Sequence, residues 1–335
     1  MVSGAVAAKA GERLVGPGEA GRCGAETGIG GPSGAACGGR ADLRADGDGA
    51  MIDAGTAAVT PAHPRGRPPG RGGPACHDAP MARLGDLLDD LDDLLVPGTF
   101  RDYGPNGLQV PHPDGADAEV RTVVTAVSAD LEALEAAAAV GADLVLVHHG
   151  LFWDGAPREL DPVAAGRLRV LLAGGIALAA YHLPLDGHAE VGNNALLASA
   201  LGATWTPWAG SGSPPVGVVA TWETPVPVDE LLDRVATATQ PRPLHFPGGP
   251  DAVRRLAIVS GAAAGMVADA AADGLDGLLT GEPREQTRGL AREHGIHAIC
   301  AGHHATETRG VQALGERLAE RFGVTHRWVD TANPI

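Results

Sequence analysis

The segment GADLVLVHHGLFW, residues 141–153, decides the fold class of this chain. Its apolar run at 143–147 suits a strand that is buried within a parallel sheet. Helical patterns precede this strand at 131–140, where Asp130 is a plausible N-cap, and follow it at 163–173. Strands that alternate with helices predict an α/β fold with mostly parallel pairing.

The same alternation extends along the chain on both sides of this segment. We expect further strands at 121–127, 176–181, 217–221, 256–259, 275–280, 296–301 and 325–329. We expect further helices at 228–239, 264–272, 284–294 and 305–321, and one that Asn193 caps and that runs to residue 201. Each half places a His-His pair directly after a buried strand, at 148–149 and at 303–304. This pattern is a weak internal repeat of two halves, about 81–205 and 250–335.

Residues 1–80 differ in composition from the rest of the chain. They contain 19 Gly and 8 Pro but no Phe, Trp or Tyr. A segment so poor in large apolar groups cannot offset the entropy of ordering itself, so we expect a disordered extension. Three of the four cysteines also lie there, which leaves Cys300 as the single thiol of the predicted domain. One thiol cannot form an intramolecular disulfide, and this fits a cytoplasmic location.

The charge balance excludes several classes of function. The formal net charge is −16 and the only lysine is Lys9. An acidic chain is a poor match for nucleic acid or an anionic membrane surface. The lack of later lysines excludes enzymes that need a P-loop or Schiff-base lysine in the folded part. The longest uncharged apolar run, 170–181, is too short to cross a bilayer.

Six side chains suitable for metal chemistry follow the predicted strands: His148, His149, His182, Asp186, His303 and Glu307. Ligands of α/β sheets bind at the carboxyl ends of strands, so we expect these side chains to meet there. Imidazoles and carboxylates together favour first-row divalent ions such as Zn, Fe, Mn or Co. Six donors exceed the need of one tetrahedral site, so we predict two metal ions that share a carboxylate.

Other interpretations of the same residues stay open. Two histidines and one carboxylate can bind a single iron for oxygen chemistry. A protein that stores or delivers metal, or that serves as a scaffold, needs no catalysis at all.

The turn at 260–265, SGAAAG, lacks a full phosphate-binding motif and is interpreted as a tight turn. Two ions a few ångströms apart favour hydrolysis of a phosphoester, amide or ring C–N bond.

Several longer motifs resemble one known family. They are DYGPNGLQV (102–110), GADLVLVHHGLFW (141–153), YHLPLDGHAEVGNNALLA (181–198), LLTGE (278–282) and AGHHATETRGVQALGERLAERFG (301–323). In order and spacing they resemble the dinuclear-metal-centre hexameric family, also called GTP cyclohydrolase 1 type 2 or NIF-three-like. The resemblance extends from Met81 to Ile335.

The resemblance implies a fold of two related α/β lobes with mostly parallel sheets and the metal site between them, and it implies an assembly. It implies metal ligands at His148, His149, Asp186, His303 and Glu307. His182 lies at the site without being a standard ligand, so we predict a catalytic role for it. The resemblance also implies that the chain forms a homohexamer and acts on a small molecule, such as a nucleotide. Relatives usually carry a histidine shortly after the Gly-Glu pair at 281–282, where this chain has Gln286.

Overall fold

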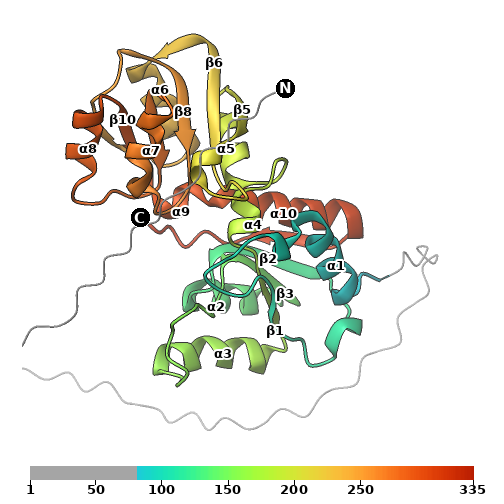
Figure 1. The fold of residues 1–335 in the computed structure, drawn as a ribbon. Helices are drawn as coiled ribbons and strands as arrows, with labels where there is room; N and C mark the ends of the chain where they lie inside the picture. The colour runs from blue at the N-terminus through green and yellow to red at the C-terminus, as the bar shows by residue number, and fades with distance from the viewer. Residues whose placement is uncertain (1–80) are drawn as a thin grey trace, which may run out of the picture. The chain divides into compact units, whose positions relative to one another are not determined.

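The computed structural model describes residues 81–335 of the chain, as two β-sheets with helices on their faces (Figure 1). The expectations for residues 1–80, including those for their cysteines, lie outside the described residues. The α/β class predicted from the sequence is confirmed. No helix within residues 81–335 combines the length and the apolar composition that crossing a bilayer requires.

The first sheet is mostly parallel. Its five strands lie in the order β1-β4-β3-β2-β11. They are β1 (Gly107–Val110), β4 (Ala177–Ala180), β3 (Leu144–His149), β2 (Thr122–Ser128) and β11 (Thr325–Trp328). Only β1 is antiparallel to its neighbour in this sheet. Because β11 pairs with β2, the last strand of the chain joins the sheet that the first strands begin.

The second sheet is mixed, with order β5-β6-β8-β9-β10-β7. Its strands are β5 (Thr204–Pro207), β6 (Val218–Pro227), β8 (Ala252–Ile258), β9 (Gly277–Thr280), β10 (His297–Cys300) and β7 (Leu244–Phe246). The three strands β8, β9 and β10 are parallel, and the outer pairs are antiparallel. The sequence predicts the three parallel strands and also β6, whereas β5 and β7 were not expected.

The side chains of the buried strands alternate between the two faces of each sheet. Each sheet therefore has a core on both faces. In β3, Leu144 and Leu146 belong to one cluster of buried side chains, and Val145 and Val147 belong to another. Successive side chains of a strand point to opposite faces, so a continuous apolar run serves two cores. The helices that cover these faces are α1 (Leu84–Leu95), α2 (Leu131–Ala139), α3 (Pro162–Gly174), α5 (Asn193–Ala200), α6 (Val228–Ala238), α7 (Val267–Ala272), α8 (Thr287–His294) and α10 (Thr308–Phe322).

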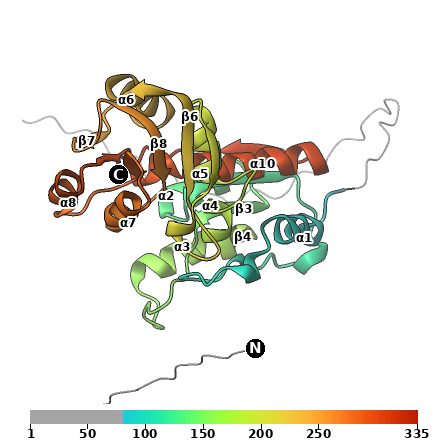
Figure 2. The same ribbon diagram turned by 45° about the horizontal axis from the view of Figure 1, so that its top comes forward.

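Helix α10 packs on β2 of the first sheet and also contacts α5, which in turn contacts β6 and β8 of the second sheet (Figure 2). Near its C-terminal end, Arg317 donates two hydrogen bonds to the buried Asp90 carboxylate of α1, at 2.9 and 3.0 Å. Arg321 also pairs with Asp90. These ion pairs hold α10 against the first helix of the described chain.

Two predicted features differ from the structure in ways that matter for the site. The helix expected at 305–321 is divided into α9 (His303–Thr306) and α10, and Glu307 lies between them with φ −115°. Asn193 is not the N-cap of α5, because Gly192 occupies that position. The Asn193 side chain instead donates to Asp186 and accepts from the backbone N–H of Gly310. The Asn193 amide, which was expected to cap the helix, therefore binds the buried Asp186 carboxylate instead.

Candidate metal centre

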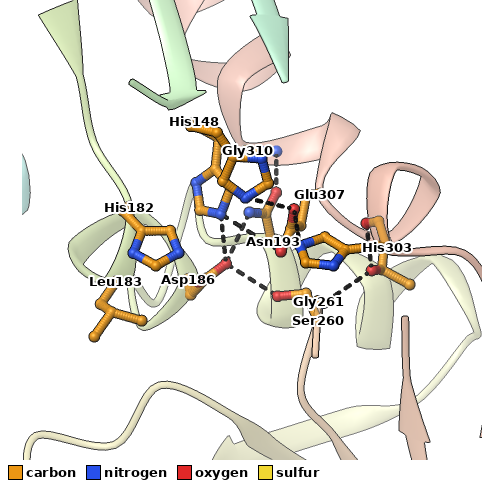
Figure 3. A network of polar contacts seen from close by, with 12 residues as sticks. His148, His182, Leu183, Asp186, Asn193, Ser260, Gly261, His303, Glu307 and Gly310 are labelled. Carbon is orange, nitrogen blue, oxygen red and sulfur yellow. Dashed lines mark hydrogen bonds and ion pairs between the residues drawn. The ribbon is translucent and has the colours of Figure 1, made fainter. Parts of the chain in front are cut away.

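Three histidines direct their Nε2 atoms at one buried carboxylate, Glu307 (Figure 3). The Oε1 atom of Glu307 lies 3.6 Å from His148 Nε2. The Oε2 atom lies 3.1 Å from His149 Nε2 and 3.3 Å from His303 Nε2. Asp186 adds a second carboxylate, with Oδ1 at 3.6 Å from His148 Nε2. All five predicted ligands therefore lie together.

The ends of secondary-structure elements place these side chains. His148 and His149 are the last residues of β3, and the short helix α4 (Leu183–Asp186) ends at Asp186. His303 is the first residue of α9 and Glu307 follows that helix. A residue at the end of a strand or helix can turn its side chain out of the core while its backbone stays fixed. This local order explains how a dense polar cluster coexists with the surrounding apolar core.

The other ring nitrogen of each histidine has its own partner. His148 Nδ1 lies 3.0 Å from the carbonyl oxygen of Tyr181, and His149 Nδ1 lies 3.0 Å from Ser128 Oγ. His303 Nδ1 lies 3.5 Å from Glu282 Oε1. Partners of this kind fix the ring orientation and leave Nε2 free to bind a metal, as is usual for metal-binding histidines.

Three groups of donors could each hold an ion: two of them share Glu307, and the third consists of His148, His149 and His182. We call His148, Asp186 and Glu307 the buried half-site, and His149, His303 and Glu307 the open half-site. In the buried half-site the side chains are at most 9% exposed. In the open half-site, His149 and His303 are 19% and 27% exposed. Within each group the donor atoms lie within 4.8 Å of one another.

The residues fit a divalent ion by two criteria. In a tetrahedral site with bonds of about 2.1 Å, neighbouring donor atoms are about 3.4 Å apart, and the donor separations here are 3.1–3.6 Å. In addition, His148 Nε2 and Glu307 Oε2 are buried without a hydrogen-bond partner within residues 81–335. Unpaired buried polar atoms are costly and rare, so two of them at one point favour the binding of a cation there.

The electrostatics of the cluster also favour a cation. Burial disfavours a charged His148, but Asp186 and Glu307 outweigh burial and raise the pKa of this histidine to about 9. Burial would likewise raise the pKa of Glu307, yet the charge of His148 holds it well below its usual value. Without a metal, a proton on His148 therefore balances the two carboxylates. A divalent ion would take the place of this proton.

His182 forms a separate pair with Asp102, a residue that the sequence analysis did not single out. His182 Nδ1 lies 2.6 Å from Asp102 Oδ1, and Asp102 Oδ2 accepts hydrogen bonds from Leu183 N–H and Asn106 Nδ2, both at 2.9 Å. Burial raises the pKa of Asp102, but the hydrogen bonds from His182 and Asn106 outweigh it and lower this pKa to about 2. The carboxylate thus stays ionised and orients the imidazole. Asp102 opens the motif DYGPNGLQV, which was the only signal of its role.

Several cavities border the cluster, and two of them are large. One, of about 500 Å³, is lined by Asp186, Glu307 and the small residues at 260–263. The other, of about 460 Å³, is lined by His149, Trp153 and Arg167. His182 and His303 line both of them. Gln286 is exposed at the start of α8 and lines neither cavity. A small molecule can therefore approach the centre from two sides.

Comparison with known proteins shows which family the chain is similar to. The family model described as Duf34/NIF3 (NGG1p interacting factor 3) matches residues 82–334. A GTP cyclohydrolase 1 type 2 homolog of Pseudomonas aeruginosa is 42% identical over 252 residues, which cover 75% of this chain and 98% of the relative. A homolog with the same name from Allochromatium vinosum is 41% identical over 269 residues, which cover 77% of this chain and 99% of the relative.

Solved structures agree with the sequence relatives. Protein ybgI is 38% identical, with a TM-score of 0.69, and the match covers 76% of this chain and all of ybgI (100%). Protein TTHA1606 from Thermus thermophilus is 36% identical, with a TM-score of 0.68 and the same coverage of 76% and 100%. The described part of the chain therefore corresponds to whole relatives.

Proposed function

This chain belongs to the Duf34/NIF3 family, and we propose that it is a metal-dependent hydrolase that holds two divalent first-row ions and acts on a small molecule. The ions we propose are Zn, Fe, Mn or Co, because imidazole and carboxylate donors suit these metals. The proposed ligands are His148, His149, Asp186, His303 and Glu307. The buried and open half-sites would each hold one ion.

The position of Glu307 carries this proposal. Its Oε1 atom faces the buried half-site and its Oε2 atom faces the open half-site. A carboxylate that is 2% exposed and surrounded by three imidazoles is well placed to bridge two cations. Its negative charge would reduce the repulsion between them, and the interaction is strong because little water screens it.

The chain's own residues then determine the chemistry. When bound, paired metals activate water as a nucleophile and stabilise charge on the bond that breaks. His182 lines both cavities, and Asp102 holds its Nδ1 proton. The Nε2 atom of His182 is thus left to accept a proton from water or to donate one to a leaving group. We propose this acid–base role for His182 and an orienting role for Asp102.

The substrate and the assembly are proposed from the family relationship. The name of the relatives makes GTP the first substrate to assay, and phosphoesters the second. Both reactions would use the same water nucleophile and the same proton carrier. The resemblance also leads us to propose a homohexamer, which native mass spectrometry at micromolar concentration would test directly.

Elemental analysis of the natively purified protein tests the metal-binding part of the proposal. We expect about two ions per chain, and fewer in His149→Ala, because that change removes a donor of the open half-site. His294→Ala is the matched control, since His294 is an exposed histidine of α8. Equal and low metal content in the wild type and His149→Ala would overturn the proposal. Two bound ions without turnover of GTP or phosphoesters would instead favour a metal carrier.

A further inference from the structure

Arg167 of α3 lines the cavity beside the open half-site but has no partner there. Its Nε atom is buried without a hydrogen bond within residues 81–335. The arginine ion pairs of these residues do not include it and involve Arg83, Arg121, Arg234, Arg317 and Arg321. His149 and His303 of the open half-site line the same cavity.

Of the acidic residues near Arg167, Glu159 lines a further cavity with it but forms no ion pair with it within residues 81–335, and two others accept backbone hydrogen bonds. Asp130 lines the cavity beside the open half-site, but its carboxylate accepts the backbone N–H of Ala133 and caps α2. Asp161 lies close in sequence, but it accepts the N–H of Ala164 and caps α3 itself. Each carboxylate thus stabilises a helix start. The guanidinium group of Arg167 is left without the anion that a partly buried arginine normally pairs with.

The buried, unpaired Nε–H of Arg167, next to a metal-ligand cluster, favours an acceptor from outside the described residues. A buried donor without an acceptor is destabilising, and an oxyanion is its strongest partner because the planar guanidinium offers parallel N–H groups. Trp153 forms a fixed wall of the same cavity, since its Nε1–H donates to the carbonyl oxygen of Gly150 at 3.1 Å. The cavity is therefore bounded by an aromatic ring, a cation and the open half-site.

We infer that Arg167 binds an anionic phosphate group of the substrate, in the cavity between α3 and the open half-site. This inference rests on the proposed hydrolase function and adds to it the class of substrate and the side of approach. The other cavity supplies an internal comparison. Arg284 lines that cavity and is exposed to solvent, so it is not left with a buried, unpaired donor.

Calorimetric titration of the Co²⁺-loaded protein with inorganic phosphate tests the inference. We expect Arg167→Gln to weaken phosphate binding about tenfold or more, as for the loss of a charge-assisted hydrogen bond. Arg167→Lys should have an intermediate effect, because it keeps the charge but loses the fork of donors. Arg284→Gln is the matched control and should bind phosphate as the wild type does. Co²⁺ binding, titrated first in each variant, should be unchanged.

Each outcome separates this inference from the proposed function. No phosphate binding by Co²⁺-loaded wild type, or equal binding by wild type and Arg167→Gln, would overturn the inference alone. A loss in Arg284→Gln instead would place the anion in the other cavity and would also overturn it. Failure of the wild type to bind Co²⁺ would be a failure of the proposed function itself. Thermal unfolding of each variant checks that the fold is intact, and Arg167→Lys covers the case of an unstable Arg167→Gln.

Discussion

The two half-sites share Glu307 but differ in charge and in access to water. The buried half-site has two carboxylates and one histidine, whereas the open half-site has one shared carboxylate and two histidines. His148 is fully buried, and His303 is 27% exposed. Charges interact more strongly where water is excluded. We therefore expect the buried half-site to retain its ion and the open half-site to exchange its ion and meet the substrate.

The largest expected effect is that of Glu307→Gln. The amide keeps the shape of the side chain but removes the charge that both half-sites share, so both ions should be lost. We expect metal content below about one tenth of the wild-type value, since two charged bridging contacts disappear. Inductively coupled plasma mass spectrometry measures this directly. His182→Gln is the comparison and should keep nearly all of its metal; wild-type metal content in Glu307→Gln would remove Glu307 from the site.

Changes at one half-site should remove one ion each and so distinguish the two. Asp186→Asn removes a donor of the buried half-site, and His149→Ala removes a donor of the open one. Withdrawal of metal from the wild type by a chelator should proceed in a fast phase and a slow phase. We expect His149→Ala to lack the fast phase and Asp186→Asn to lack the slow phase. Loss of the same phase in both variants would mean that the half-sites are not independent.

A smaller effect is expected from the hydroxyl groups that support each half-site. Ser260 Oγ donates to Asp186 Oδ1 at 3.0 Å, and Ser128 Oγ lies 3.0 Å from His149 Nδ1. Loss of such a supporting contact weakens metal binding by about tenfold or more. Ser260→Ala should weaken the slowly released ion, and Ser128→Ala the rapidly released one. Competition with a coloured chelator measures the affinity for each ion. Weaker binding of the same ion in both variants would contradict this expectation.

The smallest effect on metal is expected at Asp102, outside both half-sites. Asp102→Asn should leave metal content unchanged but alter the dependence of stability on pH. The pKa of Asp102 is lowered from 3.8 to about 2, so its contribution is present above pH 4 and is lost as the pH falls toward 2. This shift corresponds to roughly 2 kcal/mol.

Urea unfolding of metal-free protein at several pH values measures this contribution. The difference in free energy of unfolding between wild type and Asp102→Asn should be about 2 kcal/mol near pH 6 and should shrink between pH 4 and 2. Asp93→Asn is the control, because Asp93 is an exposed residue of α1. A difference that does not change with pH would show that Asp102 acts through packing and not through its charge.

Local patterns predicted most of the elements and six candidate site residues, and the family resemblance implied which five of them are ligands. Apolar runs that end in His148-His149 and that precede His303 identify strand ends, and strand ends of parallel sheets lie at one edge. The pairing of His303 with Glu307 was expected from helical spacing. The structure reaches the same contact through a break in the helix at Glu307. Side-chain contacts of this kind depend on the local backbone, which spacing alone does not determine.

The remaining features depend on contacts between distant parts of the chain. Asp102 meets His182 across 80 residues, and no periodicity or spacing encodes that pair. The role of Asn193 depends on Asp186 and on Gly310 of α10, so its short polar side chain alone suggested only a helix cap. Edge strands β5 and β7 are four and three residues long, too short for a reliable alternating pattern.

Helix α10 and strand β11 are the last elements to be synthesised, and this order has a consequence for the nascent chain. Strands β1–β4 are complete at Ala180, but β2 gains its outer neighbour only when Thr325–Trp328 has been made. Val311, Leu314 and Leu318 of α10 also cover one face of that sheet. At translation rates of about 5–20 residues per second, roughly 150 residues take about 7–30 s. During this time the nascent chain exposes an open strand edge and an apolar face, so it is prone to aggregation until α10 and β11 have been made.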